Sequence, residues 1–293
     1  MLTEDQKRTY YEDGVLVIKD MIPSEKLLNY RDAYERMVEK VRAHPNAKEE
    51  YNARLIGGKT NTESPTEEEQ KEIWGADWLL HPDLYEPEFT DYLENEKLIS
   101  ALQCLLGPDL ELYGLKALWS PVNITYDLYW HRDGKQDSYS TDGGIPPGWL
   151  QWNTALYREE SFHVVKGSHR RPLSEEESTI YGTTKPVANQ EVLVLEPGEA
   201  LFMHQAVLHR GKALSTSKRR AFHYIVARTD FAVGTRRLRQ FKEWYDQLNL
   251  GQKLGPISKP LFENFFAWEG RTFDDNTYPY PPGGRSPDKK EQN

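Results

Sequence analysis

The chain has 293 residues, and its 37 basic and 46 acidic side chains give a formal net charge of −9. This acidic balance argues against general nucleic-acid binding, for which a basic surface supplies most of the affinity. A single cysteine, Cys104, excludes an internal disulfide, and no stretch approaches the roughly 18–20 apolar residues needed to cross a bilayer. Because the polar start, Met1–Gln6, is also unlike a secretory signal, we expect a cytoplasmic protein that binds neither nucleic acid nor membrane.

The first hundred residues carry mainly helical signals. Thr3 and Gln6 have the spacing of a capping box at the start of a short helix, which should end at Gly14 before the apolar run Val15–Ile18. Ser24 is placed to cap a longer helix, in which apolar residues recur at mostly helical spacing.

The segment from residue 43 to residue 72 differs from its surroundings. It is charged and polar, and it contains Gly57-Gly58 and Ser64-Pro65. This composition is typical of a loop or lid, and a solvated insertion without a role fits it equally well.

From Leu110 onward the pattern becomes typical of strands. Many short apolar or aromatic runs, separated by glycine and proline turn signals, indicate a sandwich or barrel. The expected strands are Leu110–Trp119, Ile124–His131, Leu150–Tyr157, Phe162–Val165, Glu191–Leu195, Ala200–His204 and Ala221–Ala227.

We expect these elements to form one domain over residues 1–275. It would comprise a helical N-terminal part (1–108, with the lid at 43–72), a β core (109–232) and a C-terminal helix (236–250), and residues 276–293 would form a flexible tail.

The triplet His131-Arg132-Asp133 follows an aromatic segment that suits an extended strand. Residues two apart on a strand point to the same face, so an imidazole and a carboxylate can converge there on one cation. The downstream segment Pro197–His209 offers a third ligand in His204 or His209. Two histidines and one carboxylate describe the non-haem iron(II) oxygenase site.

The order of several motifs resembles the phytanoyl-CoA dioxygenase family over most of residues 2–230. The motifs are residues 2–18, His131-x-Asp133, Gly167-Ser168-His169, Pro197–Phe202 and His209 followed by Arg219. The resemblance implies a mostly β fold with flanking helices around a double-stranded β-helix (jelly-roll, cupin-like) core. It also implies an enzyme that uses Fe(II), 2-oxoglutarate and O2.

Carried over by position, the resemblance makes His131, Asp133 and His209 the catalytic metal ligands. His209 is preferred to His204 because the family commonly has an aromatic residue or histidine five positions before the distal ligand. The family has a glycine directly after that ligand, whereas here Arg210 precedes Gly211.

The distal carboxylate of 2-oxoglutarate needs a cation with fork geometry, which arginine supplies. The segment Arg219-Arg220-Ala221 resembles the family's Arg-x-Ala strand, and alignment on that triplet selects Arg219, whereas counting from the histidine tolerates Arg220. Only one of the two should face inward, because adjacent strand residues point in opposite directions. In the family, the strand that corresponds to Asn153–Leu156 often carries a residue that contacts the co-substrate or supports the residues that do, and Asn153 is the candidate for that role here.

Three protein ligands leave three positions on an octahedral iron, two for the 2-oxo acid and one for O2. Loss of CO2 from 2-oxoglutarate yields succinate, and the iron and co-substrate carry the oxidation. Family members that halogenate replace the carboxylate ligand with a small residue, so Asp133 favours hydroxylation, desaturation or ring formation. The expected substrate is a small organic molecule such as a natural-product intermediate.

Two other interpretations fit the same motifs. The first is a non-catalytic β-barrel binding or regulatory protein that retains the fold, which the irregular Arg210 would suit. The second is a cupin-like metalloenzyme without a co-substrate, which would have no need for Arg219.

Overall fold

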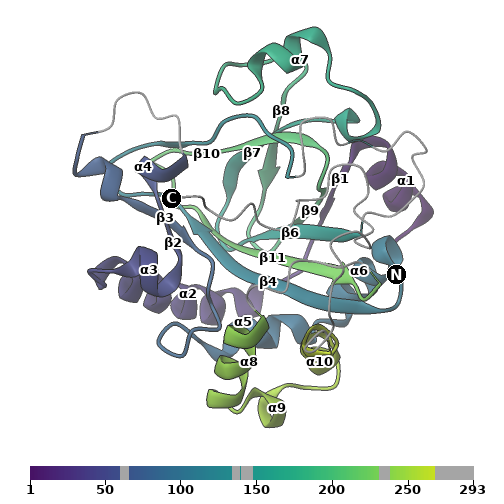
Figure 1. Cartoon of the computed structure of the whole chain (residues 1–293). Helices are drawn as coiled ribbons and strands as arrows, with labels where there is room; N and C mark the ends of the chain where they lie inside the picture. Colours follow the sequence, from purple (N-terminus) through teal and green to yellow (C-terminus); the bar gives the residue numbers. More distant parts are fainter. Residues whose placement is uncertain (60–65, 134–138, 140–147, 231–237, 268–293) are drawn as a thin grey trace.

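The chain folds around two antiparallel sheets that face each other (Figure 1). The structure is a computed structural model that describes residues 1–59, 66–133, 139, 148–230 and 238–267. Within these residues the larger sheet has the strand order β1-β9-β6-β11-β4-β3-β2 and the smaller sheet the order β5-β10-β7-β8. The strands are β1 (Val15–Ile18), β2 (Ala53–Leu55), β3 (Ile73–Ala76), β4 (Leu110–Trp119), β5 (Tyr126–Asp127), β6 (Trp149–Ala155), β7 (Glu159–Val165), β8 (Glu191–Leu195), β9 (Ala200–His204), β10 (Leu208–Ala213) and β11 (Arg220–Arg228).

The strand connections are those of a jelly roll. From β4 to β11, consecutive strands alternate between the larger and the smaller sheet, except that β7 and β8 are neighbours in the smaller one. An apolar cluster between the sheets joins Val15 of β1 and Leu201 of β9 to Phe162 and Val164 of β7. The expected mostly β fold with a double-stranded β-helix core is therefore confirmed.

Helices cover the outer face of the larger sheet. In Figure 1, α2, α5, α8 and α10 lie along the side of β4 and β11 that faces away from the smaller sheet. Their apolar side chains join those of β4, β6 and β11 in the main hydrophobic core. The helices are α1 (Glu4–Asp13), α2 (Leu27–Ala43), α3 (Ala47–Tyr51), α4 (Ile56–Lys59), α5 (Pro87–Asp91), α6 (Glu96–Leu106), α7 (Glu175–Ile180), α8 (Leu238–Gln247), α9 (Leu250–Lys253) and α10 (Lys259–Phe266), with 3-10 turns η1 (Ser24–Lys26), η2 (Glu69–Lys71), η3 (Tyr92–Glu94) and η4 (Ser168–Arg170).

The side chains of strand β11 alternate between the two faces of the larger sheet, which have different surroundings. Phe222 and Tyr224 point outward into the helix-covered core. His223, between them in the sequence, points to the inner face, where its ring contacts Asn153 of β6. Since side chains alternate along a strand, the residues that share this inner face are fixed by position.

Most elements lie where the sequence places them. Thr3 and Gln6 form the expected capping box of α1, and Gly14 adopts a left-handed conformation (φ 77°) that ends the helix before β1. Strands β4, β8 and β9 have the expected bounds, and α8 lies within the expected helix at 236–250. The expected tail at 276–293 lies outside the described residues.

Three expectations about local structure were wrong. Ser24 makes no side-chain capping bond, and a 3-10 turn precedes α2 there. The expected strand Ile124–His131 is regular only over β5. The N-terminal part, expected to be helical, also supplies β1, β2 and β3 to the larger sheet.

The polar segment 43–72 is more structured than a loop. Its described part contains α3, the edge strand β2, α4 and η2. The pairing of β2 with β3 places β2 at the edge of the larger sheet.

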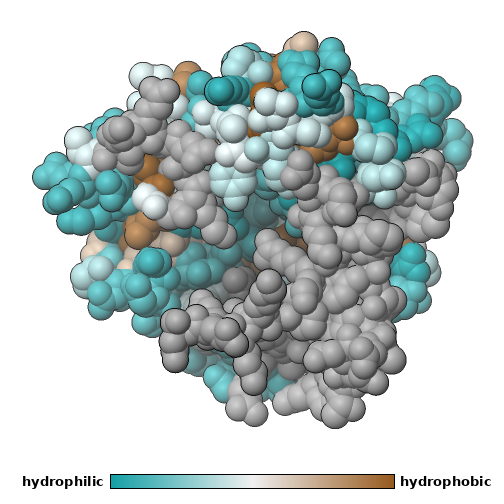
Figure 2. Space-filling model, turned by 45° about the horizontal axis from the view of Figure 1, so that its top comes forward, coloured by the Kyte–Doolittle hydropathy of each residue, from teal (hydrophilic) through white to brown (hydrophobic). Residues whose placement is uncertain are grey.

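None of the helices in the described ranges is both long and apolar enough to cross a membrane. On the face turned forward in Figure 2, the described surface is mostly hydrophilic, and its hydrophobic residues form small separate spots.

Candidate metal centre

Three side chains that the sequence singles out come together between the sheets. One ligand atom from each of His131, Asp133 and His209 lies within 4.8 Å of the others. The backbone brings the two histidines side by side, because each donates its N–H to the carbonyl of the other at 2.9 and 3.0 Å. Their rings are consequently 4.3 Å apart between centroids.

Asp133 is held in the cluster from two directions. Its backbone N–H donates to the carbonyl of Gln205 at 3.0 Å, and its carboxylate accepts a short hydrogen bond from the Gln151 side-chain amide of β6. The carboxylate oxygens lie 3.7 Å from the Nε2 atoms of both His131 and His209. Backbone hydrogen bonds to His209 and Gln205 therefore align His131 and Asp133, whereas the sequence predicted a continuous strand.

Hydrogen bonds fix both imidazoles so that Nε2 faces the cluster. The Nδ1 atom of His131 lies 2.8 Å from the carbonyl of Tyr129, and that of His209 lies 2.9 Å from the carbonyl of Val207. Because a carbonyl can only accept, each Nδ1 carries a proton, and the bond turns Nε2 toward the cluster. Burial, followed by the neighbouring His209, lowers the pKa of His131 to about 4, so this ring is neutral at physiological pH.

This donor set suits a divalent transition metal. Two imidazoles and one carboxylate on one side of an ion would leave further coordination positions open, as in non-haem iron sites. The bonds at Nδ1 are the outer contacts that usually orient histidine ligands. The residues present could therefore hold Fe(II).

His204, the alternative distal ligand, lies outside this cluster. Its ring packs against that of His169 at 4.8 Å, and its Nδ1 accepts the N–H of Ala206. Burial lowers its pKa to about 3. His204 is thus a packed core histidine next to the Gly-Ser-His turn.

The adjacent arginines separate as the alternation rule predicts. Arg219 points between the sheets, where its Nε donates to Glu159 of β7 at 2.8 Å and its guanidinium lies 5.1 Å from the ring of Phe162. Arg220 points outward and donates to Glu35 of α2 at 3.0 Å. Among the described residues, the buried Nη2 of Arg219 has no hydrogen-bond partner.

Tyr126 lies beside Gly211 and near Arg219. Gly211 follows His209 by two residues on β10, so it shares the inner face. A Cβ at Gly211 would lie 2.9 Å from the Tyr126 hydroxyl oxygen. Glycine at this position therefore allows the Tyr126 ring to pack closely against β10. Burial raises the pKa of Tyr126, and the positive charge of Arg219 acts against that rise, as expected for neighbouring groups.

Asn153, the other proposed co-substrate contact, also lies between the sheets. It is fully buried on β6, and its side-chain oxygen lies 2.9 Å from Nδ1 of His223. Its side-chain nitrogen has no partner among the described residues, which leaves a donor directed into the interior.

Sequence reasoning missed Gln151 and Glu159. Gln151 precedes Asn153 by two residues and so had to share its face, and this alternation was an available signal. Glu159 stands between Arg158 and Glu160 in the sequence and looks like one of a run of surface charges.

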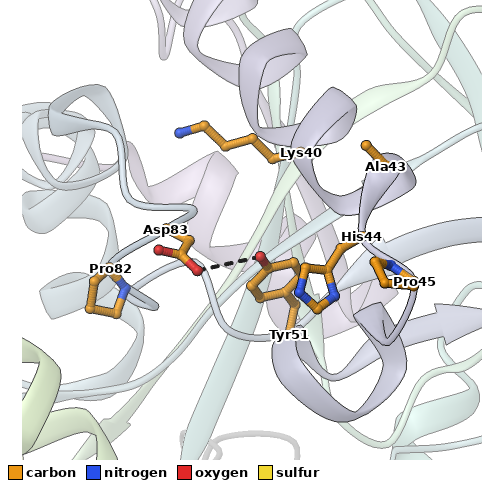
Figure 3. A pocket seen from close by; sticks show the side chains of 7 residues that line it. All are labelled: Lys40, Ala43, His44, Pro45, Tyr51, Pro82 and Asp83. Carbon is orange, nitrogen blue, oxygen red and sulfur yellow. Dashed lines mark hydrogen bonds between the residues drawn. The ribbon is translucent and has the colours of Figure 1, made fainter.

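A separate open pocket lies on the helical side of the molecule. It has a volume of about 570 Å³, and Figure 3 shows Tyr51 within hydrogen-bond reach of Asp83 across it. None of the predicted metal or co-substrate residues lines this pocket, and its lining does not combine the donors of a metal site. It is lined by Lys40, Ala43, His44, Pro45, Tyr51, Pro82 and Asp83.

Comparisons with known proteins agree with this geometry. The model of a family described as phytanoyl-CoA dioxygenase matches residues 10–222, whereas a search of curated proteins found no match. The fold is similar to that of HygX from Streptomyces hygroscopicus with nickel, 2-oxoglutarate and hygromycin B bound, at 17% identity and a TM-score of 0.56 over 79% of this chain and 89% of that one. It is also similar to EctD from S. alaskensis with 2-oxoglutarate and 5-hydroxyectoine (15% identity, TM-score 0.57, 78% and 77% of the chains). The carbocyclase SnoK from nogalamycin biosynthesis matches at 19% identity and a TM-score of 0.53, over 78% and 85% of the chains.

Proposed function

This chain belongs to the phytanoyl-CoA dioxygenase family of Fe(II)- and 2-oxoglutarate-dependent oxygenases, and we propose that it oxidises a small organic molecule at an iron held by His131, Asp133 and His209. The convergence of these three side chains between the sheets carries the proposal. The neighbours that bind hygromycin B or 5-hydroxyectoine support a small-molecule substrate.

The protein's part in this chemistry is to hold and orient. Bound iron and 2-oxoglutarate supply the oxidation, with decarboxylation of the oxo acid to succinate. His131 and His209 would offer Nε2 atoms that their Nδ1 hydrogen bonds already orient. Gln151 fixes the rotation of the Asp133 carboxylate, so that one oxygen stays directed at the metal position.

Arg219 is the proposed anchor for the distal carboxylate of 2-oxoglutarate. Its buried Nη2 has no partner among the described residues and can donate a charge-assisted bond to that carboxylate. Arg220 is unsuited because it points away from the interior toward Glu35. The unpartnered amide nitrogen of Asn153 offers a further contact in the same interior.

The outcome of the oxidation is hydroxylation, desaturation or ring formation in this proposal. All three begin with attack on a C–H bond of the substrate, and all three use the same three ligands. Asp133 fills the position that a halide would need, which sets halogenation apart from this group.

Calorimetry on metal-free protein tests the proposal directly. We expect 2-oxoglutarate to bind only after addition of Ni(II), and succinate to form when Fe(II) and O2 are supplied with a suitable substrate. Asp133→Ala should weaken metal binding by more than about 100-fold, because loss of outer contacts alone typically costs 10–100-fold. Asp83→Ala, an exposed carboxylate outside the cluster, serves as the matched control.

Metal binding by Asp133→Ala at wild-type affinity would contradict the assignment of the ligands. Binding of 2-oxoglutarate without metal, or no binding at all, would favour a non-catalytic β-barrel that retains the fold.

A further inference from the structure

One ion pair crosses the interior beside the proposed co-substrate anchor. Glu159 comes from β7 of the smaller sheet, and Arg219 immediately precedes β11 of the larger one. The carboxylate accepts the Nε–H of Arg219 at 2.8 Å, and the two side chains are only 2% and 1% exposed. The pair thus links the two sheets at the place where 2-oxoglutarate is proposed to bind.

An irregularity in β7 makes this contact possible. Glu159 and Phe162 are three residues apart, so a regular strand would send their side chains to opposite faces. The register of β7 against β8 shifts between these two residues. As a result Glu159 binds the edge of the Arg219 guanidinium while the ring of Phe162 lies 5.1 Å from its centre.

These two contacts leave a defined part of the guanidinium available. Glu159 occupies Nε, and Phe162 packs against the group, so both the direction and the plane of the guanidinium are constrained. The buried Nη2 is left without a partner among the described residues. A terminal nitrogen fixed in this way can meet a carboxylate without a search through rotamers.

The charge of Glu159 alone does not explain why a carboxylate lies beside Arg219. A carboxylate beside an anion-binding group repels the incoming co-substrate, so it weakens the attraction of Arg219 for 2-oxoglutarate. Burial raises the pKa of Glu159, and Arg219 and Ser161 act against this rise. Orientation of the guanidinium is the benefit that remains.

We propose that Glu159 is a positioning residue for the co-substrate, which holds Arg219 by Nε so that its terminal nitrogens face the distal carboxylate of 2-oxoglutarate. This inference rests on the proposed role of Arg219 as the anchor.

The test compares Glu159→Ala and Glu159→Gln in Ni(II)-loaded protein by calorimetric titration with 2-oxoglutarate. Glu159→Ala frees the guanidinium and should raise the Kd by about tenfold or more, the scale on which outer contacts act on bound groups. Glu159→Gln keeps an oxygen for Nε and should hold the Kd within about threefold of the wild type, since one bond to the same atom is retained. Under turnover with Fe(II), KM for 2-oxoglutarate should rise in Glu159→Ala while kcat at saturation stays close to wild type.

Glu159→Asp provides a second variant if Glu159→Ala does not fold. It keeps the charge but withdraws the carboxylate from Nε by one methylene, so it should also weaken 2-oxoglutarate binding. A purely structural role would lower Tm in these variants and leave the Kd unchanged, which would overturn the inference.

Arg219→Ala separates this inference from the proposed function. If Arg219→Ala loses 2-oxoglutarate binding but the Glu159 variants do not, only the positioning role fails. If Arg219→Ala binds 2-oxoglutarate like the wild type, the anchor itself has been misassigned.

Discussion

Replacement of Arg219 by alanine should destabilise the protein strongly, apart from any effect on 2-oxoglutarate. The side chains of Arg219 and Glu159 are almost completely buried. Removal of one partner from a buried ion pair leaves an uncompensated charge, which typically costs about 3–5 kcal/mol of unfolding free energy. We expect a loss of this size at pH 8.

The loss should shrink as the pH falls. Burial raises the pKa of Glu159 above its ordinary value of 4.5, and in Arg219→Ala the opposing charge of the arginine is gone. A raised pKa in the folded state means that the folded protein binds the proton more readily than the unfolded chain. The penalty for the buried carboxylate is therefore complete above the folded pKa and absent below about pH 4.5, where the group is neutral in both states.

Urea unfolding at pH 8 and pH 5 measures this difference, and Arg220→Ala is the natural control. Arg220 pairs with Glu35, whose side chain is 28% exposed, so its loss should cost no more than about 1–2 kcal/mol. Equal losses for the two variants at pH 8, or a loss for Arg219→Ala that does not depend on pH, would refute this reasoning.

Two further variants test single contacts, one beside the turn at His169 and one at Asp133. Gly14→Ala should lose about 1–3 kcal/mol more stability than Gly182→Ala in thermal or urea unfolding. The two glycines have nearly the same φ, 77° and 78°, but only a Cβ at Gly14 would overlap His169. Equal losses for the two variants would contradict this. Gln151→Ala should weaken metal binding about 10–100-fold with little change in Tm, because Asp133 loses the amide that orients it. Competition with a chelator measures the latter, and an unchanged metal affinity would show that Asp133 is oriented without Gln151.

The sequence carried the information for the predicted metal cluster because few residue types can serve as ligands. His131 and Asp133 stand two residues apart, and His209 follows in a recognisable order of motifs. Strands β4 and β9 were predicted with their observed bounds, because each is a continuous run of mostly apolar residues. Here local pattern and tertiary structure agree.

Strand β10 escaped prediction for the opposite reason. Its sequence, Leu208–Ala213, places His209, the proposed ligand, and Gly211 on the inner face, and Arg210 and Lys212 on the other. Along the strand, apolar and polar residues do not alternate in the way that identifies a half-buried strand. Its identity depends on pairing with β7 and β5, which lie far away in the sequence.

Glu159 could not have been identified from its neighbours either. Arg158 and Glu160 are exposed and pair with each other, and Glu159 between them is buried. Its burial depends on the register shift in β7 and on Arg219, which lies 60 residues further along the chain. A buried charge of this kind can be recognised only when the position of its ion-pair partner is known.

Arg210, which departs from the family's ligand motif, fits the alternation of side chains along β10. Arg210 follows His209, so its side chain turns to the outer face, where it pairs with Asp127 at 3.0 Å and lies over the ring of Trp130. Gly211 then returns to the inner face, where a side chain would collide with Tyr126. A glycine one position later than in the family pattern is therefore the glycine that shares a face with His209. The shifted glycine therefore keeps the close packing of Tyr126 against β10, beside Arg219.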